Sequence, residues 1–461
     1  MAERLFGTDG VRGKAGSYPL DARTIRRFGA ALVRALSHGA PSAAAALGTP
    51  HGHAGRALRL LVGRDTRESG EWIERELARG ASSQGAVLSS VGVLSTPAIA
   101  YLTCSMAFDA GFVISASHNP FEDNGIKVFS GAGGKLGERL EAEVEQIMAG
   151  PWEVQEDVAV EVERVDLADR YLAHVRTALP DPGRLGPLRL AVDCANGATS
   201  ALAPRLFRDL GFDVVALSCA PDGRNINLNC GSTHPQNLAA AVRQHRCRLG
   251  VAFDGDGDRA IFVDAQGRVV DGDAVMLLCA KQLKATGRLR GSGVVATVMS
   301  NIGLEIALRE QGIDLVRCAV GDRYVMEEMI ARNLALGGEQ SGHIIFSDFL
   351  FTGDGLITAL QVLDTMAAAG RELADLAGEL RTCPQVLLNV RVARKVDLTQ
   401  VPDVAAIITD VERDLGNRGR LLVRYSGTEP LLRIMLEGQD PDAIRRWAEE
   451  IASAVRTRLG A

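Results

Sequence analysis

One pattern of residues occurs three times in this 461-residue chain and limits how it can fold. An apolar run ends in a polar loop, a helix-like stretch follows, and a glycine precedes the next apolar run. The copies cover residues 60–88, 190–215 and 294–316, with glycines at positions 85, 211 and 312. Glycine ends a helix readily because it adopts the left-handed conformation without steric cost. The pattern predicts three βαβ units in series, each with a largely parallel sheet.

The chain changes character after residue 383. Residues 386–392, 421–424 and 432–436 are strand-like, and residues 401–415 and 443–458 are helix-like. We therefore expect the α/β fold class, with three similar mixed α/β domains in series and a smaller C-terminal α+β domain. A chain of this length is too long to fold around a single hydrophobic core. The predicted domains are residues 1–165, 166–270, 271–383 and 384–461.

The composition limits which classes of partner the protein can bind. The net charge of −6 argues against nucleic acid or an anionic membrane as the main partner. No apolar run reaches the roughly 18 residues of a membrane span, and the N-terminus lacks a signal core. The eight cysteines are scattered without a CxxC pair, so they do not form a disulfide framework. We expect a cytoplasmic protein.

A polar loop follows the apolar run at residues 111–114 and contains Ser117, His118 and Asn119. Pro120 prevents this loop from continuing directly as a helix. Open α/β sheets bind ligands outside the carboxyl ends of their strands, which makes Ser117 a candidate functional residue. An ordinary turn is the alternative interpretation. A nucleophile elbow for acyl transfer needs Gly-x-Ser-x-Gly, and Ser117 lacks both flanking glycines.

Three carboxylates, Asp254, Asp256 and Asp258, alternate with glycines between two strand-like runs. Like charges this close repel each other unless a cation neutralises them. An EF-hand loop would need Gly at its sixth and Glu at its twelfth position, where this chain has Arg259 and Ala265. We therefore predict a Mg²⁺ site in preference to an acidic turn, with room in the coordination shell for a phosphate oxygen.

Three further loops carry groups that suit a phosphorylated sugar. Residues 337–343 hold a carboxylate, an amide, a hydroxyl and an imidazole, as expected for a polyhydroxyl ligand, although a plain turn explains them equally well. Residues 423–433 combine two hydroxyls, glycine-exposed amides and two arginines, which favours a phosphate nest over a salt-bridged hairpin. Residues 6–13 place Arg12 among glycines, either as a turn or as an approach to an anion.

These motifs, in this order, resemble the α-D-phosphohexomutase family over nearly the whole chain. Finer signatures resemble its amino-sugar branch, and they lie at residues 6–13, 114–120, 221–227, 338–342 and 352–355. The resemblance implies four domains around a central cleft. It also implies an isomerase that transfers a phosphoryl group between O6 and O1 of a hexosamine phosphate and supplies the synthesis of UDP-N-acetylglucosamine. The same resemblance leaves open whether the protein is a monomer or a homodimer.

The resemblance also implies roles for single residues. Ser117 would carry the phosphoryl group, and Asp254, Asp256 and Asp258 would hold Mg²⁺ together with an oxygen of phosphorylated Ser117. The sugar hydroxyls would contact Glu339 and Ser341. Other matched positions are those that grip the non-reacting phosphate (Arg424, Ser426, Gly427, Thr428 and Arg433) and those near the reacting oxygen (Arg12, Lys127 and His343).

Some alternatives stay open at this point. The residues do not settle which group near the reacting oxygen is the general acid or base. A phosphomannomutase or phosphoglucomutase of the same fold would differ only in its sugar. A non-catalytic sugar-phosphate sensor would bind without turnover. Residues 37–55 depart from the family as an insertion rich in Ala, Gly and Pro, away from every motif.

Overall fold

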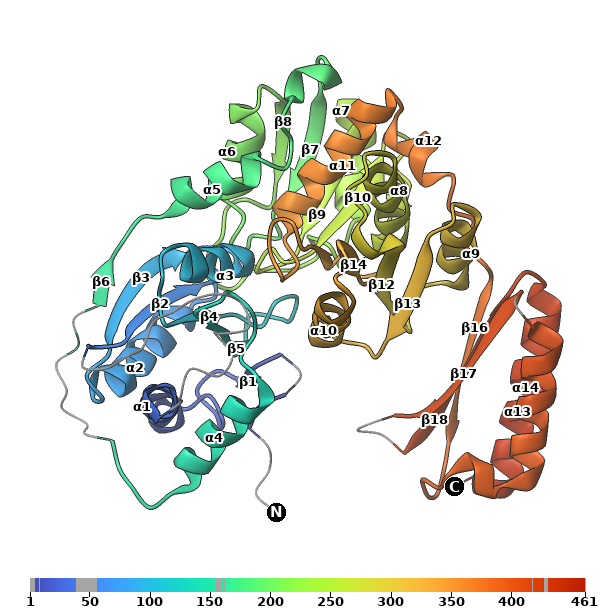
Figure 1. The fold of residues 1–461 in the computed structure, drawn as a ribbon, viewed down its shortest axis with the longest axis horizontal. Helices are drawn as coiled ribbons and strands as arrows, with labels where there is room; N and C mark the ends of the chain where they lie inside the picture. The colour runs from blue at the N-terminus through green and yellow to red at the C-terminus, as the bar shows by residue number, and fades with distance from the viewer. Residues whose placement is uncertain are drawn as a thin grey trace. The chain divides into compact units, whose positions relative to one another are not determined.

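The computed structural model of this chain describes residues 5–7, 9–38, 56–154, 160, 162–416, 418–426 and 430–460. Two compact units divide the chain. The first consists of residues 1–299 and 313–378, and the second of residues 300–312 and 379–461. Figure 1 shows that both combine helices with sheets. Most of the insertion at residues 37–55 lies outside the described residues, as do Gly427 and Thr428.

A six-stranded sheet forms the N-terminal part of the first unit, in the order β1-β5-β4-β2-β3-β6. Strands β4, β2, β3 and β6 are parallel, whereas β5 and β1 add an antiparallel edge. Helices α1 and α2 pack against each other. The elements are β1 (Val11–Lys14), α1 (Ala22–His38), β2 (Arg59–Arg64), α2 (Gly70–Ser82), β3 (Val87–Val93), α3 (Thr96–Ser105), β4 (Ala110–Ile114), β5 (Asp123–Ser130), α4 (Glu138–Ala149) and β6 (Val162–Arg164).

A five-stranded sheet follows in the order β11-β10-β9-β7-β8. Its strands β9, β7 and β8 are parallel, and β10 returns antiparallel to β9. Alternate residues of these strands pack with α7 into an apolar core. The elements are α5 (Ala168–Arg176), η2 (Pro182–Leu185), β7 (Arg189–Asp193), α6 (Leu202–Asp209), β8 (Asp213–Leu217), α7 (Gln236–His245), β9 (Leu249–Phe253), β10 (Ala260–Asp264) and β11 (Val269–Val270).

The third sheet of the first unit has four strands in the order β13-β12-β14-β15. Strands β13, β12 and β14 are parallel, and β15 is antiparallel to β14. The elements are α8 (Gly272–Ala285), η3 (Arg290–Ser292), β12 (Gly293–Thr297), β13 (Asp314–Cys318), α10 (Asp322–Arg332), β14 (Leu336–Gly338), β15 (Ile344–Phe346), α11 (Gly355–Ala369) and α12 (Leu373–Ala377).

The second unit has a three-stranded antiparallel sheet in the order β16-β18-β17. Helices α13 and α14 cover one face of this sheet (Figure 1) and share an apolar core with it. The N-terminus of α9 meets the buried Glu437, to which the Ile302 amide donates at 3.2 Å. The elements are α9 (Ile302–Glu310), β16 (Gln385–Arg391), η4 (Leu398–Gln400), α13 (Pro402–Leu415), β17 (Gly419–Tyr425), β18 (Leu431–Gly438) and α14 (Pro441–Leu459).

The expected fold class is confirmed: three mixed α/β sheets precede a smaller α+β part. The three glycines of the repeated pattern, Gly85, Gly211 and Gly312, all have the left-handed backbone conformation, with φ of 78°, 88° and 62°. The sheets are more mixed than the pattern predicts, because each ends in an antiparallel strand. No helix among the described residues is long and apolar enough to cross a membrane.

The antiparallel strands position the motif loops. In each sheet, one strand runs into a motif loop and the next strand of the chain returns beside it. Such hairpins bring the loop to the carboxyl edge of the first strand, where α/β sheets bind ligands. The four loops cover residues 115–122 after β4, 254–259 after β9, 339–343 after β14 and 426–430 after β17.

Candidate active site

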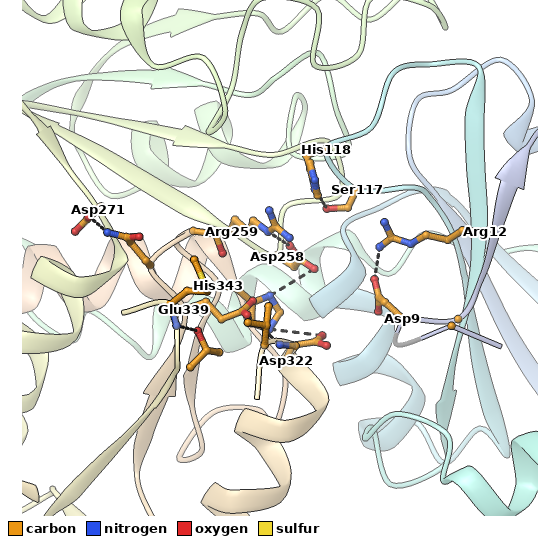
Figure 2. A pocket seen from close by; sticks show the side chains of 18 of the residues that line it. Asp9, Arg12, Ser117, His118, Asp258, Arg259, Asp271, Asp322, Glu339 and His343 are labelled. Atoms are coloured by element: carbon orange, nitrogen blue, oxygen red, sulfur yellow. Dashed lines mark hydrogen bonds and ion pairs between the residues drawn. The ribbon is translucent and has the colours of Figure 1, made fainter. Parts of the chain in front are cut away.

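One cleft of about 870 Å³ in the first unit is lined by the loops of all three sheets. Figure 2 shows the side chains that meet there. Ser117 comes from the first sheet, Asp258 from the second, and His343 from the third. Other lining residues that were predicted from the sequence are Arg12, Glu339 and Ser341, and further charged or polar ones are Asp9, His118, Arg259, Asp271, Asp322 and Gln340.

Ser117 touches the acidic loop of the second sheet. Its Oγ donates a hydrogen bond to Asp254 Oδ2 at 2.5 Å, although the two residues lie 137 positions apart. Only 1% of Ser117 is exposed. Its backbone has the left-handed conformation, with φ of 52°, which is unfavourable for a residue with a Cβ atom. Surrounding contacts must therefore hold this loop in place.

Arg67 supplies much of that support. Its guanidinium is fully buried and donates to four backbone carbonyls of the serine loop, namely those of Ser117 at 3.1 Å, Asn119 at 2.8 Å, Asp123 at 3.0 Å and Pro120. A planar group with five donors suits such a set of acceptors. Nothing in the sequence around Arg67 indicates this role.

Two further residues complete the support of the serine loop. Asp65 accepts from Arg67 Nε at 2.9 Å and from the Ser115 hydroxyl at 2.6 Å, and that hydroxyl accepts from the Ser117 amide at 2.9 Å. From the second sheet, Asn227 Nδ2 donates to the carbonyls of Ser117 and Asn119 at 2.9 and 3.2 Å. The only signal in the sequence was the position of Asn227 at the end of the 221–227 signature.

The three aspartates of the second sheet form a buried cluster that fits a metal ion. One carboxylate oxygen from each of Asp254, Asp256 and Asp258 lies within 4.8 Å of the others. The Asp254 carboxylate is oriented by the amides of Gly257 at 3.1 Å and Arg259 at 3.2 Å. Asp256 Oδ1 and Asp258 Oδ1 are buried and have no hydrogen-bond partner in the described part of the chain. Buried carboxylate oxygens need a partner, and a hard divalent cation is the partner they suit.

The pKa values of these carboxyl groups reflect the crowding of negative charge. Burial, together with the charges of Asp258 and Asp256, raises the pKa of Asp254 well above its ordinary value. Burial acts in the same direction on Asp258, but Lys127 and His343 outweigh it and hold the pKa of Asp258 well below its usual range. A cation at the cluster would favour the charged form of all three groups.

Lys127 brings a positive charge from β5 to the same cluster. Its buried ammonium lies 2.9 Å from Asp256 Oδ2, 3.5 Å from Asp258 Oδ2 and 3.0 Å from Asp9 Oδ2. Burial lowers the pKa of Lys127, but these three carboxylates outweigh it and raise that pKa well above the ordinary value. Thr96 at the start of α3 completes the partners of Asp256 through its hydroxyl, at 2.5 Å.

His343 is the last residue of the sugar-suited loop, and burial and its acidic neighbours have opposite effects on the pKa of its ring. Burial disfavours the charged ring, but Asp258, 3.6 Å from Nδ1, and Asp322 raise the pKa of His343 to about 9. The Gly353 amide donates to Nε2 at 3.1 Å, which requires that this nitrogen carries no proton. A cation bound to Asp258 would weaken the effect of this carboxylate on the pKa of His343. The neutral ring, with its proton on Nδ1, therefore fits a metal-loaded site.

Basic groups surround the space between Ser117 and the sugar-suited loop. Arg12 Nε and Arg259 Nε are buried and have no hydrogen-bond partner among the residues that the structure describes. Burial, then Arg259 and Arg12, lower the pKa of His118 to about 4, so its ring is neutral at pH 7. Glu339 Oε1 accepts from the Gly321 amide at 3.3 Å. The cleft therefore has donors for an anion and acceptors for hydroxyl groups.

The signature at residues 352–355 packs against the acidic loop at residues 254–259. The Gly355 amide donates to the Gly257 carbonyl at 3.0 Å, and a Cβ atom at Gly355 would lie 2.7 Å from the Arg259 carbonyl oxygen. Asp354 caps α11 and accepts from the buried Tyr171 hydroxyl at 2.8 Å. Burial raises the pKa of Asp354 to about 6.

The predicted phosphate loop lies in the second unit, in the hairpin of β17 and β18. Arg424 and Arg433 are directly paired in this hairpin. Directly opposite residues of an antiparallel pair lie on the same face of the sheet, so both arginine side chains belong to one face of this hairpin. Ser426 is buried, and its carbonyl accepts from Lys395 Nζ at 2.6 Å.

Comparisons with known proteins cover the whole length of the chain. Models described as "Phosphoglucomutase/phosphomannomutase" match it as alpha/beta/alpha domains I, II and III at residues 3–153, 169–267 and 271–383, and as the C-terminal domain at residues 387–454. The chain belongs to the phosphoglucomutase/phosphomannomutase family. The family resemblance drawn from the motifs is confirmed.

Within this family, the chain is similar to curated proteins named phosphoglucosamine mutase. That of Solibacter usitatus (strain Ellin6076) is 48% identical over 465 residues and matches 100% of both chains. That of Syntrophotalea carbinolica is 46% identical and matches 100% of this chain and 99% of its own. These relatives agree with the amino-sugar signatures.

Solved structures share the fold at lower identity. A phosphoglucomutase/phosphomannomutase family protein from Burkholderia thailandensis has a TM-score of 0.77 at 24% identity, covering 99% of this chain and 98% of its own. The N-acetylphosphoglucosamine mutase of Aspergillus fumigatus, solved with GlcNAc-6P and magnesium, has a TM-score of 0.63 at 18% identity, covering 98% and 95%.

Proposed function

We propose that this chain is an isomerase that interconverts glucosamine 6-phosphate and glucosamine 1-phosphate through a phosphorylated Ser117. The observation that carries the proposal is the 2.5 Å contact between Ser117 Oγ and Asp254, beside two buried carboxylate oxygens that have no hydrogen-bond partner among the described residues. The relatives named phosphoglucosamine mutase support the choice of sugar. The product would supply UDP-N-acetylglucosamine synthesis.

The reaction consists of two phosphoryl transfers in opposite directions. First, the bond between phosphorus and Ser117 Oγ breaks as O1 of glucosamine 6-phosphate bonds to phosphorus; the proton of that hydroxyl passes to a basic group of the site, and Ser117 Oγ receives a proton. The 1,6-bisphosphate then reorients in the cleft so that its 6-phosphate faces Ser117. Next, the 6-phosphoryl group is transferred to Ser117 Oγ, which gives up its proton, and O6 receives a proton. Phosphorylated Ser117 is regenerated, and the net change is an isomerisation.

Charge stabilisation accounts for most of the catalysis in such a transfer. We assign Asp254, Asp256 and Asp258 as ligands of Mg²⁺, together with an oxygen of phosphorylated Ser117. Bound there, Mg²⁺ supplies positive charge to the transferring group. We place Arg12, Lys127 and His343 next to the reacting oxygen, because this end of the cleft combines hydrogen-bond donors with the ammonium charge of Lys127. The mechanism also requires that water is kept from the phosphorylated serine, since hydrolysis would otherwise remove the phosphoryl group.

The remaining assignments concern recognition and organisation. Glu339 and Ser341 hold the sugar hydroxyls, and the non-reacting phosphate is held by Arg424, Ser426, Gly427, Thr428 and Arg433. The four proposed domains are residues 1–165 with the serine loop, 166–270 with the metal loop, 271–383 with the sugar loop and 384–461 with the phosphate loop. All eight cysteines are free thiols, which supports a cytoplasmic location. A monomer or a homodimer is compatible with these assignments.

A coupled assay of glucosamine 1-phosphate formation tests this function. The wild-type protein should turn over glucosamine 6-phosphate with Mg²⁺, lose activity in EDTA, and prefer this substrate to glucose and mannose 6-phosphates. Ser117→Ala should abolish both activity and the phosphopeptide seen by mass spectrometry. The matched control is Ser83→Ala, which removes a hydroxyl that, within the described part of the chain, is bonded to the α2 backbone carbonyl of Gly80 and to the Gln84 side chain. Retained activity in Ser117→Ala, or a preference for a neutral hexose phosphate, would contradict the proposal.

A further inference from the structure

Six ionisable side chains form a closed cycle at the reacting end of the cleft. Acidic and basic groups follow one another, and each faces the next at 3.9 Å or less. In order around the cycle, the members are Asp9, Lys127, Asp258, His343, Asp322 and Lys135. Five of them belong to the site already described or line its cleft, whereas the proposed mechanism does not use Lys135.

Lys135 joins two separate parts of the first unit. Its Nζ lies 2.5 Å from Asp9 Oδ1 and 2.5 Å from Asp322 Oδ2. Asp9 comes from the N-terminal loop, and Asp322 begins α10. Both carboxylates line the cleft and are seen in Figure 2. Lys135 itself is not part of the cleft wall; it borders a separate space of about 10 Å³ next to Asp9 and Lys127.

The backbone gives Lys135 little freedom to choose other partners. It lies in a short return after β5, where it forms a bridge with Phe129 and the Leu136 amide donates to the Val128 carbonyl at 3.0 Å. The side chain is 10% exposed. Burial lowers the pKa of Lys135, but Asp322 and Asp9 outweigh it and raise that pKa, so the ammonium stays charged.

The two partners of Lys135 face the groups assigned to the reacting oxygen. Asp9 Oδ2 contacts Lys127 at 3.0 Å and also pairs with Arg12. Asp322 Oδ2 lies 3.9 Å from His343 Nε2. One ammonium therefore contacts two of the carboxylates that face these three groups, and the others are the proposed metal ligands Asp256 and Asp258. Loss of its charge would leave the two carboxylates free to shift, and their neighbours would shift with them.

We propose that Lys135 is a positioning residue for phosphoryl transfer, which acts by holding Asp9 and Asp322 at the reacting end of the cleft. The proposal rests on the proposed function. It predicts a defect in the chemical step and not in sugar binding, because Lys135 does not line the cleft. A displacement of about 1 Å at reacting groups lowers a rate by about 10²-fold.

The test compares Lys135→Met and Lys135→Arg with the wild type in the mutase assay, with thermal unfolding measured in parallel. Lys14→Met is the matched control, since Lys14 is an exposed lysine at the end of β1. Lys135→Met should lower kcat by about 10²-fold while KM for the sugar phosphate stays within about twofold. Lys135→Arg should recover most of the loss, because it keeps the charge, and Lys14→Met should match the wild type.

Three results would overturn the proposal. One is a Lys135→Met protein with a lower melting temperature but an unchanged kcat; a second is a rise in KM alone; a third is failure of Lys135→Arg to recover any activity while it folds. If Lys135→Met does not fold, Lys135→Gln is measured against the same outcomes. A wild type that turns over only another hexose phosphate refutes the proposed sugar, and the comparison then uses that substrate. A wild type without mutase activity overturns both.

Discussion

Arg67→Lys is the substitution that best tests how the serine loop is held. The arginine side chain makes five hydrogen bonds, one to Asp65 and four to loop carbonyls, whereas a lysine ammonium has three donors. At least two of these five acceptors thus lose the bond from this side chain, although the carbonyls of Ser117 and Asn119 keep Asn227 as a second donor. Each unsatisfied buried group costs about 1–3 kcal/mol, so the serine loop should be destabilised by about 3 kcal/mol.

Amide hydrogen exchange measures this loss directly at the loop. Local opening reports on the segment itself, and a multidomain chain has no single free energy of unfolding. About 3 kcal/mol corresponds to roughly 10²-fold faster exchange, since 1.4 kcal/mol is a factor of ten. The Ser115 amide is a suitable probe because it is bonded to the Gly125 carbonyl. Phosphorylation of Ser117 and turnover should fall together with this protection.

The matched control is Arg79→Lys, at a partly exposed arginine that pairs with Glu76 on α2. Exposed ion pairs contribute about 1 kcal/mol or less, so exchange and activity should change little there. If Arg67→Lys leaves exchange at Ser115 and turnover at the level of Arg79→Lys, then the guanidinium does not hold the loop and the reasoning fails.

Three other predictions follow from the site. Asp254→Asn should weaken the binding of Mn²⁺ or Mg²⁺ and remove the pH dependence of that binding. The reason is that a cation must displace the proton that the raised pKa of Asp254 favours, so the affinity of the wild type should increase with pH. Calorimetry on both proteins at pH 6 and pH 8 measures this difference. Gly355→Ala should weaken metal binding at least tenfold, since its Cβ atom would press on the acidic loop, while Gly137→Ala, which has open space, should not. A hydrogen bond to a charged group contributes about 2 kcal/mol, so Tyr171→Phe should lower the melting temperature more at pH 8 than at pH 5, because the hydroxyl stabilises the charged form of Asp354, whose pKa of about 6 lies above the unfolded value. Equal losses of the melting temperature at both pH values would contradict this.

Residues within single motifs were the part of the site that sequence could predict. The alternating carboxylates Asp254, Asp256 and Asp258 are adjacent in the chain, and their mutual repulsion indicates a cation without any tertiary information. Ser117 stood out because it follows an apolar run and lies in a polar loop that a proline terminates. The repeated glycines predicted the three βαβ units because a left-handed residue is a local requirement.

Contacts between segments that are distant in the chain could not be predicted from the local sequence. Arg67 and Asn227 lie 50 and 110 positions from Ser117, and nothing in their local sequence indicates that they donate to its carbonyl. The local sequence indicates only an ordinary turn lysine at Lys135, and its contacts with Asp9 and Asp322 become evident in the structure. The antiparallel returns were missed for the same reason, since the direction of a strand depends on its neighbours and not on its own pattern.

The central claim is that Ser117 and the three aspartates share one divalent cation, and anomalous diffraction from crystals grown with Mn²⁺ tests it most directly. We expect a single peak bonded to carboxylate oxygens of Asp254, Asp256 and Asp258 and to an oxygen of phosphorylated Ser117, at roughly 2.1–2.2 Å as for a small hard cation. A well-occupied peak elsewhere, or one bonded to the aspartates with Ser117 phosphorylated but turned away, would contradict it.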